Sequence, residues 1–286
     1  MKPRILLSVL LALFFASRGS FAQQTNDPKQ VSLVAYAHFM TLTGEELNDL
    51  LSKARSGDAE AQFWMGNIYS EGRLVPKDSE EAARWWLKAA EQGYAPARRA
   101  YGLASRQENR PVAERWLLRA AEQGDTEAQL WLGVAYDLDW FGTVDVQEAI
   151  KWYRKAAEGG DPDAQAELGQ KYEDGDGIEQ NYQLAAEWYR KAAEHVPDLG
   201  GAGQGRNQLG LLYLQGLGVP QDYARAYFWF SLNEGHGPDA DGSEAKSHLT
   251  DAQIREVERL VTEWQERHQL SPEVAAAIQI LAANSR

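Results

Sequence analysis

A serine and a lysine near the C-terminal end are the chain's first candidates for chemistry. Ser243 and Lys246 stand three residues apart, the spacing at which a lysine can activate a serine nucleophile for acyl transfer. The Ser-Asp-Asn and Lys-Thr-Gly sequences that complete such a site do not occur anywhere in the chain. The sequence therefore gives a serine hydrolase little support.

Metal binding has equally weak signals. No histidine pairs with another at i+4, the chain has no cysteine, and the histidines are widely scattered: His38, His195, His236, His248 and His268. Asp174 and Asp176 match the first ligands of a calcium loop, but Ile178 and Ala185 occupy later ligand positions. We expect a turn at this segment, and we predict no metal and no cofactor.

Tryptophans recur along the chain at nearly constant intervals. Each follows an alanine by three positions, and the intervals are 31, 36, 36 and 41 residues: Trp85, Trp116, Trp152, Trp188 and Trp229. Five glycines recur at intervals of 36, 31, 36 and 41 residues: Gly66, Gly102, Gly133, Gly169 and Gly210. A period in the mid-thirties indicates stacked supersecondary units, which bind partners on a surface rather than in a catalytic pocket.

Each unit has the pattern of an antiparallel helix pair. In the fourth unit Asp161 is a candidate N-cap and Pro162 suits the first helical position. Ala164, Leu168 and Tyr172 then share one helical face. A glycine-rich turn leads to a second helix that carries Ala-x-x-Trp.

The second helix of most units is expected to begin at an acidic or amide N-cap. These residues are Asp78, Asp145, Asn181 and Asp222. The first two have a glutamate three positions later (Glu81 and Glu148), which is the spacing of a capping box. The second helices are expected to end before glycines that can adopt a left-handed conformation: Gly93, Gly124 and Gly160.

The combined pattern closely resembles the Sel-one-like repeat. Residues 164–194 match it along their whole length and end in Trp-Tyr-Arg-Lys-Ala-Ala-Glu. The resemblance covers roughly residues 57–235. It implies an all-α fold: an α/α superhelical solenoid of about five helix-turn-helix repeats with helical caps, similar to tetratricopeptide arrays. It also implies a scaffold, adaptor or regulator that binds a protein partner, often in a bacterial envelope.

Two units depart from the pattern. The second lacks the Gly-x-Gly turn and has residues 105–111 between its helices, and an expanded run at 195–205 precedes the fifth. We expect the superhelix to be irregular at both places.

The N-terminus predicts export. Lys2 and Arg4 precede an apolar stretch at 5–16, and Ser20-Phe21-Ala22 suits cleavage before Gln23. The stretch is too short to span a membrane, although an uncleaved anchor is the alternative. The expected organisation is a signal peptide, a linker, an N-terminal capping helix, the repeats and C-terminal capping helices, at residues 1–22, 23–43, 44–56, 57–235 and 236–286.

The capping segments have their own helix signals. Thr43 and Thr250 are each followed three residues later by Glu or Gln, which predicts capping boxes that open helices. Residues 237–242 have the composition of a loop, and Pro272 begins a last short helix.

The composition limits which cellular compartments and which kinds of partner are compatible with the chain. The formal net charge is −13, which argues against nucleic acid and anionic membranes as partners. Without cysteine, packing alone must hold an exported fold together. We expect a soluble periplasmic protein, with secretion as the alternative, and no stable membrane insertion after cleavage.

An aromatic group departs from the repeat pattern. When the opening alanine of each first helix is position 0, a turn of 100° per residue makes positions 2, 3, 6 and 10 point largely away from the buried face. We hypothesise that five residues at or near these positions line a groove that accepts an extended segment or a helix: Trp64, Trp131, Val134, Trp140 and Phe141. Packing between unequal repeats is the alternative.

The leading functional hypothesis is a periplasmic scaffold, adaptor or regulator that binds another envelope protein or peptide. One alternative is a cell-wall or β-lactam hydrolase, which would need Ser243 or a carboxylate. Another is a glycan-binding module, because sugar faces stack on tryptophan.

Overall fold

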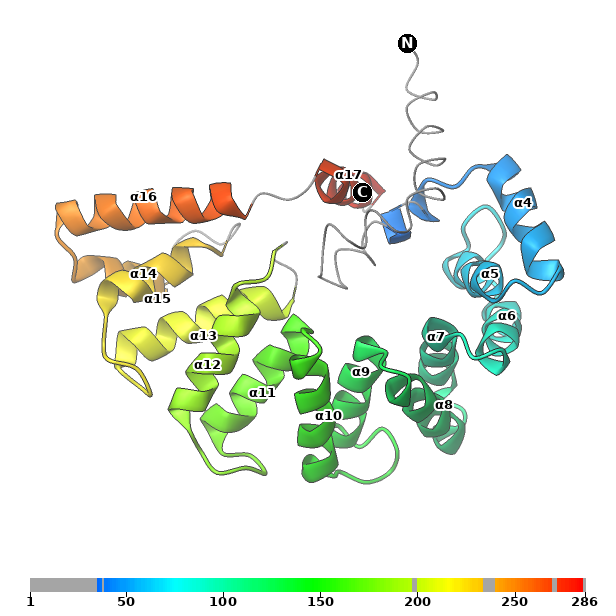
Figure 1. The fold of residues 1–286 in the computed structure, drawn as a ribbon, viewed down its shortest axis with the longest axis horizontal. Coiled ribbons are helices and arrows are strands. Elements are labelled where there is room, and N and C mark those ends of the chain that lie inside the picture. Colours follow the sequence, from blue (N-terminus) through cyan, green and yellow to red (C-terminus); the bar gives the residue numbers. More distant parts are fainter. Residues whose placement is uncertain (1–34, 38, 197–199, 234–239, 269–271, 285–286) are drawn as a thin grey trace, which may run out of the picture. The chain divides into compact units, whose positions relative to one another are not determined.

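The computed structural model describes residues 35–37, 39–196, 200–233, 240–268 and 272–284. All regular elements in these ranges are helices, which confirms the all-α class (Figure 1). The chain divides into two compact units, one spanning residues 43–269 and the other combining residues 1–42 with 270–286. The predicted signal peptide, His38 and His236 lie outside the described residues.

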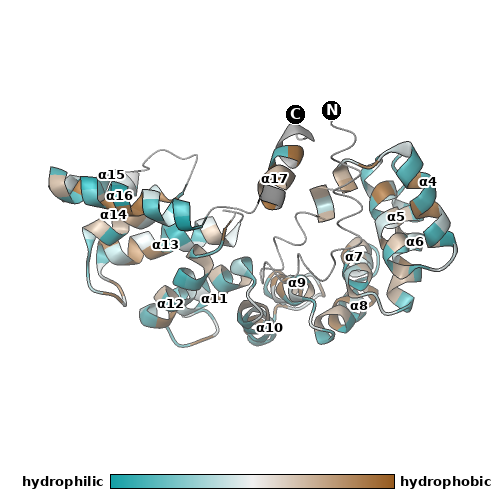
Figure 2. Ribbon diagram, turned by 45° about the horizontal axis from the view of Figure 1, so that its top comes forward, coloured by the Kyte–Doolittle hydropathy of each residue, from teal (hydrophilic) through white to brown (hydrophobic). Residues whose placement is uncertain are grey.

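The larger unit is a series of helix pairs. It begins with α4 (Gly44–Arg55), and five hairpins follow: α5 (Ala59–Glu71) with α6 (Ser79–Glu91), α7 (Ala95–Ser105) with α8 (Arg110–Glu122), α9 (Thr126–Asp137) with α10 (Val146–Glu158), α11 (Pro162–Asp174) with α12 (Tyr182–Ala193), and α13 (Gly201–Gln215) with α14 (Tyr223–Ser231). Each helix from α4 to α14 packs against the next one, as in an α/α solenoid (Figure 1). Hydrophilic and hydrophobic residues both occur along these helices (Figure 2).

The helices begin where the sequence predicts. Side chains of Asp or Asn cap the second helix of every hairpin: Asp78, Asn109, Asp145, Asn181 and Asp222. Thr43 and Thr250 form complete capping boxes. Only half of the box forms at Asp78, because the Glu81 carboxylate binds Arg84 at 2.6 Å, a charge-assisted contact. Glu148 likewise binds Lys151 at 2.9 Å.

The recurring glycines allow close helix packing inside each hairpin. A Cβ atom at Gly133 would lie 2.5 Å from the ring of Tyr153, and one at Gly169 would lie 2.7 Å from the ring of Tyr189. Each of these glycines contacts the residue that comes immediately after the repeat tryptophan in the sequence. That residue is aromatic in four hairpins and is Leu117 in the second, so each glycine recurs with a large apolar partner because the two form one contact.

The repeat tryptophans have related environments. Trp152 is 4% exposed, with the Lys155 ammonium 4.1 Å from its ring centroid. Trp188 is half-buried, and the Lys191 ammonium lies 3.7 Å from its centroid. Lys88 and Arg119 sit over the first two repeat tryptophans in the same way. This shared environment supports the predicted hydrophobic spine.

A polar contact also repeats between hairpins. In every hairpin, one side chain of the opening helix donates to the carbonyl of an alanine that is the last or second-to-last residue of the preceding helix. The distances are 3.0–3.1 Å, and the donors are Gln62, Arg98, Gln129, Gln165 and Arg206. The carbonyls at a helix end have no partner within their own helix. This hydrogen bond therefore satisfies one of them at every junction.

The C-terminal part of the larger unit packs on the last hairpin. α15 (Ala240–Ser247) and α16 (Asp251–Arg267) both contact α14. The expected loop at 237–242 is wrong from Ala240 onward, because α15 begins there and fully buries Ala245 in the core of this region. α16 buries Val257 in the same core.

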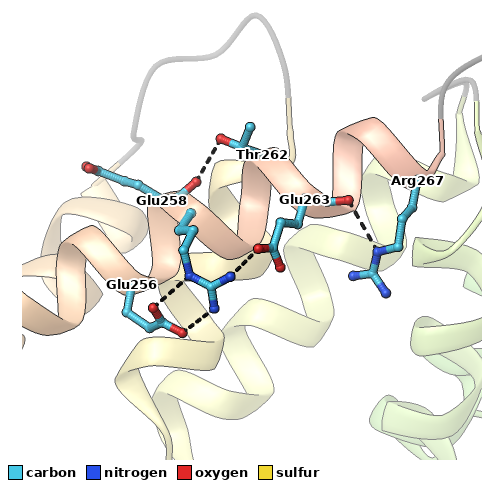
Figure 3. Close-up of polar contacts among 6 residues, drawn as sticks. Glu256, Glu258, Thr262, Glu263 and Arg267 are labelled. Atoms are coloured by element: carbon cyan, nitrogen blue, oxygen red, sulfur yellow. Dashed lines mark hydrogen bonds and ion pairs between the residues drawn. The ribbon is translucent and has the colours of Figure 1, made fainter.

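The outer face of α16 carries exposed polar contacts. The Arg259 guanidinium binds Glu256 at 2.6 Å and also pairs with Glu263. Thr262 donates to the Glu258 carbonyl at 3.0 Å, and Arg267 donates to the Glu263 carbonyl at 3.2 Å (Figure 3). Exposed pairs of this kind contribute little stability. The smaller unit holds helical residues 35–37 and 39–40 and α17 (Pro272–Asn284), which begins at the predicted proline.

Candidate functional site

Two tryptophans stack on each other in the third hairpin. Trp131 comes from α9 and Trp140 from the turn between α9 and α10. Their ring centroids are 5.7 Å apart and their planes differ by 26°, and both side chains are half-buried. Aromatic rings favour such offset stacking.

The turn conformation returns Trp140 to α9. Its backbone N–H donates to the Ala135 carbonyl at 2.9 Å. The preceding Asp139 has φ 58°, a left-handed conformation that aspartate tolerates better than most residues. Gly142 has φ 96°, which favours glycine.

Two arginines of the second hairpin lie beside this turn: Arg106, which directly follows α7, and Arg110, the first residue of α8. The Arg106 guanidinium carbon is 4.9 Å from the ring centroid of Trp140. A Cβ atom built on Gly142 would lie 3.4 Å from Nη1 of Arg110. We call Arg106, Arg110, Leu138 and Trp140 the edge site. Leu138 is 63% exposed, and both arginine residues are exposed.

Sequence reasoning missed both arginines of the edge site. The second unit is short and lacks the Gly-x-Gly turn, so its turn differs from the others. That irregularity was visible in the sequence. The contact of Arg106 with Trp140 was not, because it joins the turns of two successive hairpins.

Three other predicted site residues lie partly in the core. Trp131 and Phe141 pack against a buried cluster that contains Leu132 and Trp152. Val134 packs against the neighbouring cluster of the third and fourth hairpins. Each keeps part of its side chain exposed, so packing explains part of their presence.

Trp64 belongs to a separate aromatic group. Its ring lies 5.1 Å from that of Phe63, which in turn lies 5.5 Å from Tyr94. α5 packs against α4 and α6, whereas α9 packs against α8 and α10. The second hairpin thus separates Trp64 from Trp131, and within the described residues their ring contacts are to different partners.

A network of charges joins the third and fourth hairpins. The Lys171 ammonium binds Asp137 at 2.7 Å and Asp176 at 2.6 Å. Burial raises the pKa of the half-buried Glu167, and the charge of Asp137 raises that pKa further. Burial also raises the pKa of Tyr153. These groups tie the two repeats together.

The Ser243–Lys246 pair does not have the electrostatics of an activated nucleophile. The Lys246 ammonium lies 3.7 Å from Glu258 and 5.2 Å from the ring centroid of Tyr227. Its hydrogen bond with Tyr227 raises the pKa of Lys246. A lysine that acts as a base needs a lowered pKa, which is the opposite shift.

The candidate calcium loop is the turn between α11 and α12, as expected. Gly175 and Gly177 both have φ 71°, and Asp176 binds Lys171. Across the described ranges, no group of three or more His, Cys, Asp or Glu residues is placed to hold a metal ion.

Fold and surface together define an α-helical repeat protein. The Sel1 repeat, which is the Sel-one-like repeat, matches residues 59–94, 98–125, 126–161, 162–195 and 204–232. The chain belongs to the Sel1 repeat family. Repeats of this family generally mediate protein–protein interactions.

Two solved structures are similar to this chain. One is a protective antigen present in uropathogenic Escherichia coli strains that displays an SLR fold, with 30% identity and a TM-score of 0.68 over 87% of this chain. The chain spans 56% of that protein's length. The other is a Sel1 repeat protein from Oxalobacter formigenes, with 27% identity and a TM-score of 0.59, covering 79% of this chain and 87% of that one. No curated protein matches the chain.

Proposed function

We propose that this protein is a periplasmic scaffold, adaptor or regulator that binds another envelope protein through its third repeat. The hypothesised contact residues are Trp131 and Trp140 with Val134 and Phe141, and Trp64 forms a second contact, with one hairpin between the two. The stacked pair Trp131–Trp140 carries the proposal. Within this pair, Trp140 comes from an irregular turn, so the packing of the repeats does not require a tryptophan at that position.

The position of the stacked pair supports a binding role. Large aromatic side chains that stay partly exposed supply much of the energy in protein interfaces. Irregular turns in repeat proteins commonly lie on the binding face. Family membership supports a protein partner, and the predicted signal peptide supports export. Within the described residues no helix is long and apolar enough to cross a membrane.

Selective loss of partners would test the function. Residues 23–286 are immobilised and incubated with envelope extract, and the retained proteins are quantified by mass spectrometry. Trp140→Ala should lose specific proteins while its melting temperature stays near that of the parent, since Trp140 is outside the buried core.

Trp64→Ala tests the second proposed contact separately, because the Trp64 ring belongs to a different aromatic group. If both variants retain every protein that the parent retains, and only their melting temperatures fall, the tryptophans serve packing and the proposal is wrong. Cell fractionation and N-terminal sequencing test the compartment. The expected result is a soluble periplasmic protein that begins at Gln23.

A further inference from the structure

The guanidinium of Arg106 is positioned to bind an anion. It lies over Trp140, a contact that restrains a long and otherwise flexible side chain. A guanidinium that contacts a ring through its face keeps the N–H groups along its edge available. Those groups match the two oxygens of a carboxylate.

Both arginines of the edge site lack a carboxylate partner in the described part of the chain. The acidic residues nearby have other partners: Asp137 binds Lys171, Glu114 accepts from the Tyr136 hydroxyl at 2.7 Å, and Asp145 caps α10. Glu108 and Asp139, in the same two turns, form no ion pair with either arginine. Arg106 and Arg110 are therefore exposed cations without a carboxylate partner among the described residues, in a chain whose formal net charge is −13.

Exposed apolar side chains flank the turn that carries Trp140. Leu138 and Val144 are 63% and 58% exposed, and they stand at the two ends of the turn that carries Trp140. They are two of the five large hydrophobic residues that are exposed among the described residues. The turn that Arg106 contacts through Trp140 therefore also exposes apolar side chains at both of its ends.

We propose that the edge site binds a peptide segment of the partner protein in which an acidic residue adjoins an apolar one. The carboxylate pairs with Arg106 and Arg110, and the apolar side chain covers Leu138. This inference rests on the proposed function and names the chemistry of the partner. A peptide fits better than an acidic sugar, because the Trp140 ring already contacts Trp131 and Arg106 and the remaining surface is aliphatic.

A peptide-display selection on residues 23–286 tests the proposal. Random twelve-residue peptides are selected on the parent protein, and the enriched sequences are synthesised with a fluorescent label. The expected sequences contain Asp or Glu next to Leu, Ile, Phe or Trp. Replacing that acid by Asn or Gln should weaken binding about tenfold, because a charge-assisted contact is lost. Added salt should weaken binding of the acidic peptide more than that of its amide copy.

Three variants separate the edge site from other cations. Arg106→Gln should lose the acidic preference. Arg106→Lys should lose most of it, because a lysine keeps the charge but not the planar pair of donors. Arg119→Gln is the matched control, since Arg119 also lies 4.9 Å over a tryptophan, Trp116, but belongs to the regular repeat. It should bind as the parent does.

The proposal is overturned if no peptide is enriched, if the enriched peptides lack acidic residues, or if Arg106→Gln binds them as the parent does. Binding of oligouronates but not peptides, lost in Arg106→Gln, would also overturn it and would favour the glycan alternative. The experiments distinguish a failure of this inference from a failure of the proposed function. If Arg106→Gln retains the same envelope proteins that Trp140→Ala loses, the scaffold role stands while the acidic-peptide inference falls.

Discussion

Single glycines decide how closely the two helices of a repeat approach. At Gly169 a methyl group would overlap the ring of Tyr189, which is fully buried and has no room to move. Gly169→Ala gains helix propensity worth about 1 kcal/mol but should still lower the free energy of unfolding, because overpacking costs roughly 1–3 kcal/mol. Thermal and urea unfolding followed by circular dichroism measure the change.

Gly44→Ala is the matched control for that change. Gly44 also lies in a helix, but nothing lies within 4 Å of the position of its missing Cβ. The control should be neutral or slightly stabilising. A Gly169→Ala variant as stable as Gly44→Ala would show that the close approach at Tyr189 is not required.

Glu167 gives the junction of the third and fourth repeats a pH dependence. Its pKa is raised by burial and by Asp137, so the folded chain holds this proton more tightly than the unfolded chain. Stability from this group is therefore lost as pH rises above the ordinary range of a glutamate, about 4.3. Glu167→Gln should raise the melting temperature at pH 7 and leave it unchanged at pH 3.

Differential scanning calorimetry at both pH values measures that effect. The exposed Glu187→Gln on α12 is the control and should show no such difference. A lower melting temperature for Glu167→Gln at pH 7 would mean that the carboxylate stabilises the junction, against this interpretation.

At the scale of elements, one arginine joins the last repeat to its capping helix. Arg206 is 2% exposed and donates to the carbonyls of Ala193, His195 and Leu232 at 3.0, 2.8 and 3.2 Å. Its guanidinium carbon lies 5.0 Å from the ring centroid of Trp264 on α16. The ends of α12 and α14 are thus bound to one side chain under the cap.

Removing this side chain should loosen the C-terminal cap. Arg206→Met leaves three carbonyls without their donor, and we expect a loss of about 3 kcal/mol. Amide hydrogen exchange should rise most in α16. Arg98→Met is the control, because Arg98 makes the same contact at the second junction, 3.1 Å from the Ala90 carbonyl, but is only half-buried. Equal effects of the two variants, or unchanged exchange in α16, would contradict this role of Arg206.

The sequence predicted most of the elements because their signals are local. The periodic alanines, the Asp and Asn N-caps and the Thr43 capping box each act within one or two turns of helix. α15 was missed from Ala240 onward, because a segment rich in Gly and Asp becomes helical only when Ala245 is buried against other helices. Tertiary packing overrode local preference there.

The candidate site was predicted less completely. Trp131 and Trp140 were found because they depart from the repeat, and the structure stacks them. Arg106 and Arg110 were not found, because the contact of Arg106 with Trp140 and the position of Arg110 beside Gly142 depend on how the second and third hairpins pack together. The sequence pattern groups Trp64 with Trp131 and Trp140 because of its position in the repeat. The structure separates them, because α5 packs against α4 and α6, whereas α9 packs against α8 and α10.

At the scale of the whole molecule, the claim is that regular repeats form a spine, while the irregular turns within the second and third repeats recognise a partner. Site-specific photo-crosslinking in cells tests it most directly. A benzophenone amino acid replaces Leu138, and in a separate variant it replaces Leu260, an exposed residue of α16. The account predicts a discrete crosslinked envelope protein from position 138 that disappears when Arg106→Gln is added, and none from position 260. No adduct at position 138, or the same adducts from both positions, would contradict it.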